Sequence, residues 1–397
     1  MIVADAAPRF RWSAAALYRL LLLWLAGIDL RLTILAVPPV LPLIHRDLAL
    51  DEKSVAALTG LPVLLFGILA VPGSLLIARI GARGALILGL LTVAIASALR
   101  GVGPSTPLLF AMTLLMGAGV AVMQPALPSL ARQWFAGAAA LATAVYANGL
   151  LIGEALAAGL TLSLVLPLAG GSWERSFVLW AGPVWVTAML IIAGTSDAAA
   201  ATTRTRVRWW PEWRDPEVWR LGLIQGGSSL VYFACNAFVP DFLHASGRPA
   251  LVNATLTALN AGQLPASLVI LILAQRLAGR RGPLVAAAVL SLVGVGALLL
   301  PDDGAVVAGA ALIGFCSAFL LTLVLALPPL LAAPEEVHRL AAGMMAIGYT
   351  LAFVVPFLGG ALWDATGVPA TAFVPAALGA LLVLITAMAL RPAGRRA

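Results

Sequence analysis

Three ionisable side chains lie inside long apolar stretches of the chain. Asp29 and Arg31 belong to WLAGIDLRLTILAVPPVLP (24–42), and Glu154 belongs to ANGLLIGEALAAGL (147–160). An arginine at the centre of a membrane helix costs about 2.5–3.5 kcal/mol on insertion scales, so it is retained for a function or for a fixed partner. The rigid donor fork of Arg31 suits a planar oxyanion. The alternative is a structural ion pair with Asp29 or Glu154.

The two carboxyl groups are candidates for proton coupling. Side chains at positions i and i+2 of a helix point about 200° apart, so Asp29 faces away from Arg31 unless the helix is broken. A buried carboxyl group can act as a proton carrier, or it is a structural acid that bonds to nearby backbone or hydroxyl groups. Glu154 can titrate as the coupling site, pair with Arg31, share a proton with the helix of Asp29, or simply lie between helices.

Uncharged polar side chains occur at similar depths in other apolar stretches. They are Gln124, Tyr146, Asn148, Tyr232, Asn236, Asn260, Gln263 and Tyr349. Inside a membrane such groups often only join neighbouring helices, by less than about 2 kcal/mol each. As a set they indicate a polar pathway. The residues that we expect to contact a substrate are Asn148, Tyr232, Asn236, Gln263 and Tyr349, with Gln124 as a further candidate.

The elements that hold these residues are predicted to be membrane helices. The 397 residues are 62% hydrophobic and only 10% charged, whereas soluble domains contain about 25% charged residues. A spanning helix needs roughly 20 apolar residues. The sequence therefore predicts an all-α polytopic membrane protein with twelve transmembrane helices, at 16–44, 55–78, 84–101, 107–130, 138–166, 176–195, 218–243, 251–275, 283–301, 305–331, 339–363 and 369–390.

Two related halves are predicted from the loops. The polar segment 196–217 separates two pseudo-symmetric six-helix bundles, 1–195 and 218–397. ARIGARG (78–84) follows the second predicted span, and QRLAGRRG (275–282) follows the eighth. Two similar halves around a central pathway are the plan of many secondary transporters, which bind substrate near the membrane midplane.

Basic residues predict the orientation. With the N-terminus inside, 18 Lys and Arg residues lie in inner segments and 5 in outer segments, while Arg31 lies within a span. This excess predicts cytoplasmic N- and C-termini in a bacterial-type inner (cytoplasmic) membrane. The basic residues lie in short loops rather than among aromatic residues, so the net charge of +7 does not indicate a nucleic-acid partner.

Other classes of protein fit less well. Cys235 and Cys316 lie in apolar stretches as buried small residues, and the three His residues are scattered, so we expect no disulfide, metal site or cofactor. The chain contains no H-E-x-x-H or G-x-S-x-G sequence, which argues against an intramembrane enzyme. A carrier built from two halves needs no continuous polar lining, which disfavours a channel. No ATP-binding motif is present, so a gradient must drive transport. We also expect the protein to be a monomer.

The segment ARIGARG resembles the loop signature of the major facilitator superfamily, G-x-L-x-D-R-x-G-R-R. Arg79, Gly81 and Arg83 match it, whereas Ala78 stands at the position of the Asp and Ser74 at that of the first Gly. In the superfamily this loop helps to latch the two halves on the cytoplasmic side. The resemblance implies a gating role for the three matching residues.

A narrower resemblance begins in the first predicted helix. GIDLRLTILAVPPVLP (27–42) is similar to the first helix of the cyanate and nitroimidazole (nitrate/nitrite-like) transporter family, which usually reads N-x-R-P before a stretch ending in L-P. Arg31 falls on the family Arg, Asp29 replaces the usual Asn, and Leu32 replaces the usual Pro. Further segments resemble the second, fourth, seventh, eighth and eleventh helices of that family: 54–67, 116–135, 232–242, 258–265 and 341–362.

These observations predict a secondary active transporter that moves a small, planar, anionic solute such as cyanate by proton-coupled alternating access. Arg31 would bind the anion, and Asp29 or Glu154 would bind the proton. The alternative is efflux of nitroimidazole-like or other small drug-like compounds, with Arg31 on a nitro or carboxylate group and aromatic side chains stacked on the ring. The expected partners are the solute, protons and the lipid bilayer.

Overall fold

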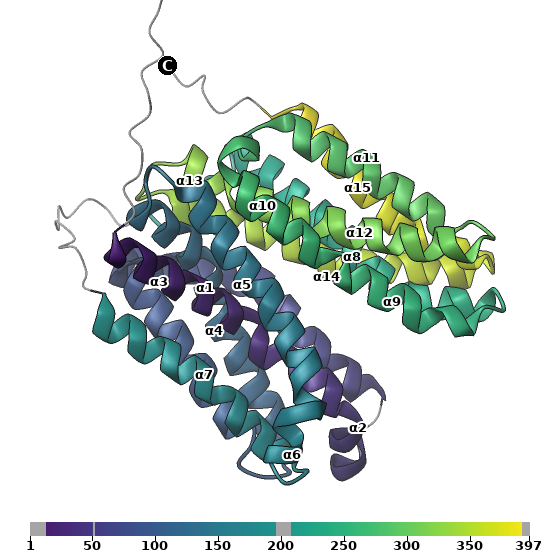
Figure 1. Cartoon of the computed structure of the whole chain (residues 1–397), viewed down its shortest axis with the longest axis horizontal. Helices are drawn as coiled ribbons and strands as arrows, with labels where there is room; N and C mark the ends of the chain where they lie inside the picture. Colours follow the sequence, from purple (N-terminus) through teal and green to yellow (C-terminus); the bar gives the residue numbers. More distant parts are fainter. Residues whose placement is uncertain (1–12, 51, 196–207, 391–397) are drawn as a thin grey trace, which may run out of the picture. The chain divides into compact units, whose positions relative to one another are not determined.

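The computed structural model describes residues 13–50, 52–195 and 208–390, which form helices and no strand (Figure 1). The ends of the chain and part of the linker, with their share of the basic residues, lie outside the described residues. The helices are α1 (Ala14–Leu35), α2 (Val37–Leu48), α3 (Glu52–Leu99), α4 (Thr106–Trp134), α5 (Ala139–Leu160), η1 (Thr161–Val165), α6 (Leu166–Leu168), α7 (Trp173–Gly194), α8 (Pro216–Ala245), η2 (Pro249–Leu251), α9 (Val252–Ala261), α10 (Gln263–Leu277), α11 (Arg281–Leu298), α12 (Asp303–Leu325), α13 (Leu327–Leu331), α14 (Val337–Thr366), η3 (Pro369–Phe373) and α15 (Val374–Met388).

Most of these helices are long and apolar enough to cross a membrane. Ten candidate spans meet that description in the described part of the chain, and one of them, Gly60–Leu99, covers 40 residues. At a rise of about 1.5 Å per residue this is roughly two membrane thicknesses, and the chain leaves helical geometry within it at Gly81. The 30-residue helix α8 is long enough for a further span. The structure is therefore consistent with the expected twelve.

The turn inside α3 depends on a glycine. Gly81 has φ 77° and ψ 162°, a backbone conformation that residues with a Cβ rarely adopt. The turn lies between the predicted spans 55–78 and 84–101, as the loop motif indicates. Arg83 follows it and fastens the second arm of α3 to the end of α7, by donating from Nε to Thr195 Oγ1 (2.7 Å) and from its guanidinium to the carbonyl of Ile192 (3.1 Å).

Two helices are interrupted near their middle. Pro38 and Pro39 follow the break between α1 and α2, and because proline has no N–H, they leave the carbonyls of Ile34 and Leu35 without the usual helical donor. The second break separates α9 from α10 at Gly262. Discontinuous membrane helices of this kind commonly lie beside binding sites in transporters.

The chain divides into two compact units. The first comprises Met1–Thr59, Gly73–Trp209 and Pro328–His338, and the second comprises Gly60–Pro72, Trp210–Leu327 and Arg339–Ala397. Thus one short segment of α3 belongs to the second unit, and a segment around α13 belongs to the first. The domain boundaries at 195 and 218 stay a prediction.

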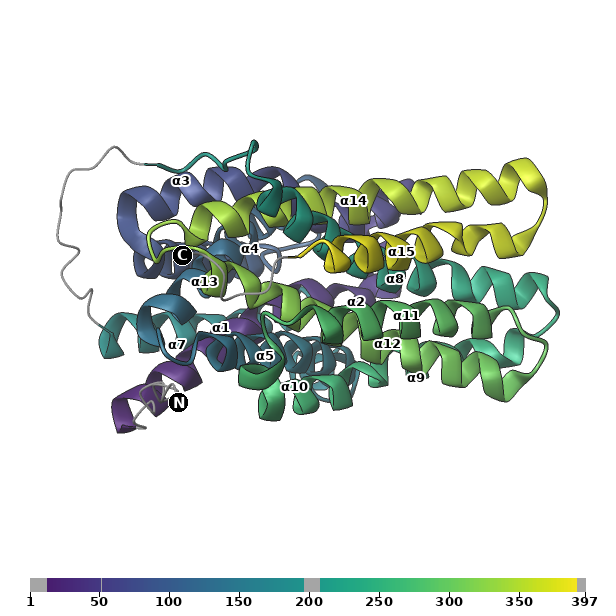
Figure 2. The ribbon, with the colours of Figure 1, turned by 90° about the horizontal axis from the view of Figure 1, so that it is seen from above.

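Close packing of α1 on α5 organises the first unit (Figures 1 and 2). A Cβ at Gly149 would overlap the carbonyl oxygen of Trp24, and a Cβ at Gly153 would overlap that of Ile28. Small residues let two membrane helices approach until their backbones touch. This contact determines which α5 side chains lie beside Arg31.

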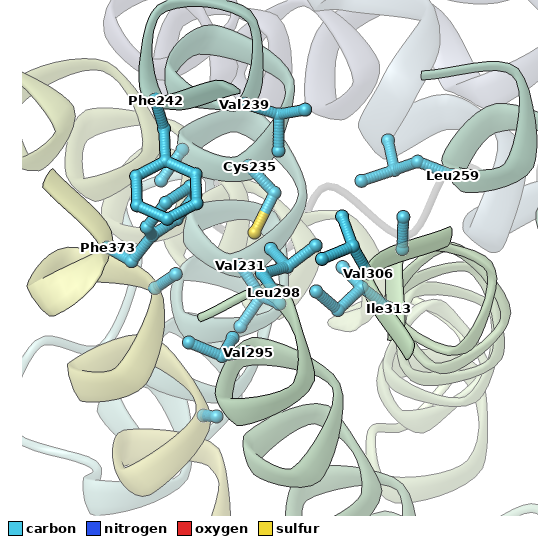
Figure 3. Close-up of a cluster of buried hydrophobic side chains, with 14 of the residues drawn as sticks. Val231, Cys235, Val239, Phe242, Leu259, Val295, Leu298, Val306, Ile313 and Phe373 are labelled. Carbon is cyan, nitrogen blue, oxygen red and sulfur yellow. The ribbon is translucent and has the colours of Figure 1, made fainter. Parts of the chain in front are cut away.

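The second unit has an apolar core in which α8 packs against α12 and α15 (Figure 3). Val231, Cys235 and Phe242 of α8 lie in it together with Ile313 and Phe373. Cys235 and Cys316 are both free and buried, which confirms their expected role as small core residues.

Candidate functional site

Arg31 of α1 forms an ion pair with Glu154 of α5. Arg31 Nε lies 3.5 Å from Glu154 Oε1, and the two side chains are 11% and 18% exposed. The pair follows from the backbone contact between Gly153, the residue before Glu154, and Ile28, which lies about one turn before Arg31. Of the two carboxylates that the sequence offers to Arg31, the structure therefore selects Glu154. The charges are mostly but not completely buried, which is a suitable setting for a solute to compete with one partner.

Asp29 lies on a different side of α1. It is 1% exposed, and its carboxyl group lies next to the Thr187 hydroxyl of α7. Among the described residues, its Oδ2 atom has no hydrogen-bond partner. The direction agrees with the expected angle of about 200° between Asp29 and Arg31. Asp29 is thus separate from the Arg31–Glu154 pair, and sequence reasoning did not identify Thr187 as its neighbour.

Asn148 lies two turns before Glu154 on α5 and is buried. Its Oδ1 accepts a hydrogen bond of 2.9 Å from Trp24 Nε1 on α1. Because Trp24 is the residue whose carbonyl touches Gly149, this bond belongs to the same helix contact. Gln124 lies on α4 and is also buried.

Four uncharged polar residues of the second unit form what we call the amide cluster: Tyr232, Asn236, Asn260 and Gln263. Tyr232 donates from its hydroxyl to Asn260 Oδ1 (2.7 Å) and accepts from Gln263 Nε2 (3.1 Å). Asn260 donates to Asn236 Oδ1 (3.3 Å). The cluster joins α8 to the two sides of the α9–α10 break. Three of its members were expected to contact a substrate.

Asn260 is the member of the amide cluster that was not among the expected substrate contacts. It is exposed, and its amide connects Tyr232 to Asn236. The signal in the sequence is its position two residues before Gly262 in ALNAGQLP. A break in a helix places the polar residues on its two sides close to one another.

Tyr349 of α14 lies apart from that cluster in the second unit. It is buried, and its ring meets the ring of Phe66 edge to face at a centroid distance of 5.3 Å. Such aromatic pairs contribute about 0.5–1.5 kcal/mol beyond their buried area. The pair is a buried aromatic contact that is distinct from the hydrogen-bonding cluster.

The loop motif has an unexpected neighbour. Ser74, at the position of the first motif Gly, donates to the carbonyl of Trp209 (2.7 Å), and its oxygen is 2.7 Å from His338 Nδ1. A hydroxyl has one proton to donate, so Ser74 accepts from His338, whose Nδ1 therefore holds a proton. Ser74 thus binds the described end of the linker and the beginning of α14. Arg79 is exposed.

Within residues 13–50, 52–195 and 208–390, no group of three or more His, Cys, Asp or Glu side chains could hold a metal ion. The first unit offers the mostly buried Arg31–Glu154 pair, and the second unit offers the amide cluster. This chemistry suits reversible binding of a small polar solute.

Known proteins with similar sequences are bacterial transporters. The chain is 30% identical over 357 residues to the cyanate transport protein CynX of Escherichia coli (strain K12), covering 88% of this chain and 90% of that protein. It is 29% identical over 355 residues to the 2-nitroimidazole transporter of the same organism, covering 85% and 86% of the two chains.

Solved structures with the same fold are also transporters. The crystal structure of the major facilitator transporter FucP in the outward conformation has a TM-score of 0.72 at 14% identity, covering 95% of this chain and 99% of that one. The structure of the human organic anion transporter MFSD10 (TETRAN) has a TM-score of 0.73 at 15% identity, with the same coverage. At these identities the likeness concerns the fold alone.

A family model described as Major Facilitator Superfamily matches residues 20–251. That match covers more than half of the chain and includes the Arg31–Glu154 pair, the loop motif and Tyr232. Together with the relative at 30% identity, it shows that this chain, an integral membrane transporter and not an enzyme, belongs to the major facilitator superfamily.

Proposed function

We propose that the protein transports a small planar anion, such as cyanate, together with a proton by alternating access. The observation that carries this proposal is the ion pair between Arg31 and Glu154 on membrane helices α1 and α5. The relative named as a cyanate transport protein supports the choice of solute. The predicted six-helix halves, the inner-membrane location with cytoplasmic termini, and the monomeric state are parts of the same proposal.

The ion pair makes anion binding and proton binding dependent on each other. While Glu154 is ionised, it neutralises Arg31 and competes with an incoming anion. When Glu154 takes up a proton, the guanidinium is available for the anion, to which it donates in a fixed planar geometry. One anion and one proton then leave the net charge of the site unchanged. Transport by this route moves no net charge across the membrane.

The two candidate proton sites differ in their surroundings. Glu154 contacts the cation that would bind the anion, whereas Asp29 faces Thr187 on the other side of α1. A proton on Asp29 can influence Arg31 only through the helix or over a longer distance. We therefore assign direct coupling to Glu154, and we propose for Asp29 an indirect role in the proton step.

In the second unit, the amide cluster would offer the solute a separate set of uncharged hydrogen-bonding groups. Its phenol and amides offer both donors and acceptors, and they are already ordered by bonds to one another. Such ordering lowers the entropy that is lost on binding. Asn148, Gln124 and Tyr349 complete the proposed set of contacts, and Arg79, Gly81 and Arg83 the proposed gating loop.

The test is uptake into proteoliposomes of a panel of labelled anions, including cyanate, with and without a pH gradient. We expect accumulation that follows the pH gradient and is insensitive to a membrane potential imposed with valinomycin and potassium. Arg31→Lys keeps the charge but removes the planar fork, so uptake should fall. Undiminished uptake by this variant would exclude planar binding by Arg31.

A second candidate function is efflux of nitroimidazole-like compounds. The observation that favours it is the Phe66–Tyr349 ring pair, a contact between two aromatic residues, beside which a small ring would bind once the pair opens, and a relative is named as a 2-nitroimidazole transporter. In this case Arg31 would bind the nitro group. Counterflow of labelled 2-nitroimidazole without any transport of cyanate would establish this alternative.

A further inference from the structure

Gln225 on α8 is a buried amide without hydrogen bonds. The residue is 0% exposed, and neither Oε1 nor Nε2 has a partner among the described residues. Buried amide groups in proteins are almost always hydrogen-bonded, and leaving one unsatisfied is destabilising. A group of this kind in the second unit needs an explanation, and the ion pair and the amide cluster do not provide one.

The position of Gln225 on α8 relates it to the amide cluster. Residues 225, 229, 232 and 236 are Gln, Ser, Tyr and Asn, and the spacing i, i+4, i+7, i+11 places them on one face of the helix. They form a continuous polar stripe on a helix that is otherwise mainly apolar. At a rise of about 1.5 Å per residue, Gln225 lies about 10 Å along α8 from Tyr232.

The neighbours of α8 show which direction the stripe faces. Ser228 donates to the carbonyl of Ser317 on α12 (3.2 Å), and Gly226 packs against Leu351 on α14. At about 100° per residue, Gly226 lies about 100° from Gln225 in one direction around the helix, and Ser228 lies about 60° from it in the other direction. The stripe therefore lies between these two contacts and faces the sector between α12 and α14.

The side chain of Gln225 is held in place by a glycine of α14. A Cβ at Gly348 would lie 3.0 Å from both Cδ and Cγ of Gln225, so the amide packs directly on the backbone of α14. The amide cluster has an exposed member in Asn260, whereas Gln225 is closed off. A movement of α14 away from α8 would expose the amide group of Gln225 without any change in α8 itself.

We propose that Gln225 is a second binding position for the transported solute, which it reaches after leaving the amide cluster. This inference rests on the proposed function. The amide provides two donors for the terminal atoms of a small planar anion, and one acceptor for a neutral polar solute. Its missing hydrogen bonds are made by the solute during the part of the cycle in which α14 has moved.

The first test compares uptake with stability in Gln225→Met. Methionine fills nearly the same volume without polar atoms, so the thermal unfolding temperature should stay the same or rise, because an unsatisfied amide is removed. Uptake of labelled cyanate should nevertheless fall at least tenfold, and Gln225→Asn, which keeps the amide, should recover part of it. Wild-type uptake by Gln225→Met would overturn the proposal.

A matched control separates binding from general effects of an unsatisfied group. Thr255 of α9 is also 0% exposed, and its Oγ1 has no hydrogen-bond partner among the described residues. Thr255→Val should raise the unfolding temperature in the same way and leave uptake at the wild-type level. An equal loss of uptake in both variants would overturn the specific role of Gln225.

The second test does not depend on the identity of the solute. The chain has two cysteines, so Gln225→Cys in a Cys235→Ala, Cys316→Ala background provides a single thiol. We expect it to react with a water-soluble methanethiosulfonate in membranes, while Val231→Cys, in the apolar core, stays unreactive. If no anion of the panel is transported, the proposed function fails, and this measurement still decides on Gln225. Absence of reaction at position 225 would show that no aqueous path reaches it.

Discussion

Neutralising Glu154 should tighten the binding of the anion. Arg31 Nε and Glu154 Oε1 are 3.5 Å apart, which corresponds to an attraction of about 5 kcal/mol at an effective dielectric constant of about 20. If desolvation and residual screening remove about half of this, about 2.4 kcal/mol remains for an anion to overcome. Glu154→Gln should therefore bind cyanate about 50-fold more tightly than wild-type protein in which Glu154 is ionised.

The assay is equilibrium binding of labelled cyanate to the purified protein over a range of pH. Wild-type protein should bind more tightly as the pH falls, because protonation of Glu154 removes the competitor of the anion, whereas Glu154→Gln should show no such change. The variant should also equilibrate cyanate across liposomes without accumulating it in response to a pH gradient. Competition at Arg31 is refuted if the affinity of the variant is unchanged or keeps the wild-type pH dependence.

Asp29→Asn is the matched comparison for Glu154→Gln. It removes one negative charge from the same helix as Arg31, but its side chain lies next to Thr187 of α7. The affinity of Asp29→Asn for cyanate should therefore stay within about threefold of the wild-type value, because the Asp29 carboxyl group faces Thr187 and not the guanidinium of Arg31. A gain equal to that of Glu154→Gln would mean that total charge, and not direct competition, controls Arg31.

Three further predictions concern packing and hydrogen bonds. Gly149→Ala would place a Cβ on the carbonyl of Trp24, so it should destabilise the protein by about 1–3 kcal/mol; an unchanged unfolding temperature in detergent would contradict the close α1–α5 contact. Ser74→Ala removes two hydrogen bonds and should lower stability by about 1–3 kcal/mol, with faster proteolysis of the linker as a second measurement. Asn260→Ala removes the acceptor of the Tyr232 hydroxyl and should weaken solute binding about fivefold, which equilibrium binding would detect; wild-type affinity would exclude Asn260 from the site.

The helices were predictable because membrane spans depend on length and hydropathy alone. An apolar stretch of roughly 20 residues must satisfy its backbone internally, so it becomes a helix irrespective of its neighbours. The turn at Gly81 was predictable for a similar local reason, since the motif places a glycine between two spans. The predicted direction of Asp29, away from Arg31, also follows from helix geometry within one element.

The partner of Arg31 could not be chosen from the sequence. The choice of Glu154 depends on which helix packs against α1, and that contact is made by Gly149 and Gly153 against backbone atoms of α1. Glycines occur throughout the chain, so their pairing across helices is visible only in three dimensions. The bond between Asn260 and Tyr232 was not predictable for a related reason, because it forms beside the break at Gly262, where α9 and α10 pack closely on the carbonyl of Ala311 in α12.

The distribution of charge over the two units suggests which residues determine which property of transport. The first unit holds a cation and its competing carboxylate, so on the proposed function its residues determine whether the solute must be an anion and whether a proton accompanies it. The amide cluster has no charge, and its groups both donate and accept. On the same proposal, the cluster would discriminate between solutes by shape and hydrogen-bonding pattern, because a site that is built to form a hydrogen bond strongly rejects an analogue that cannot form it. Substitutions in the cluster should change the preferred solute without altering proton coupling, and substitutions at the ion pair should do the reverse.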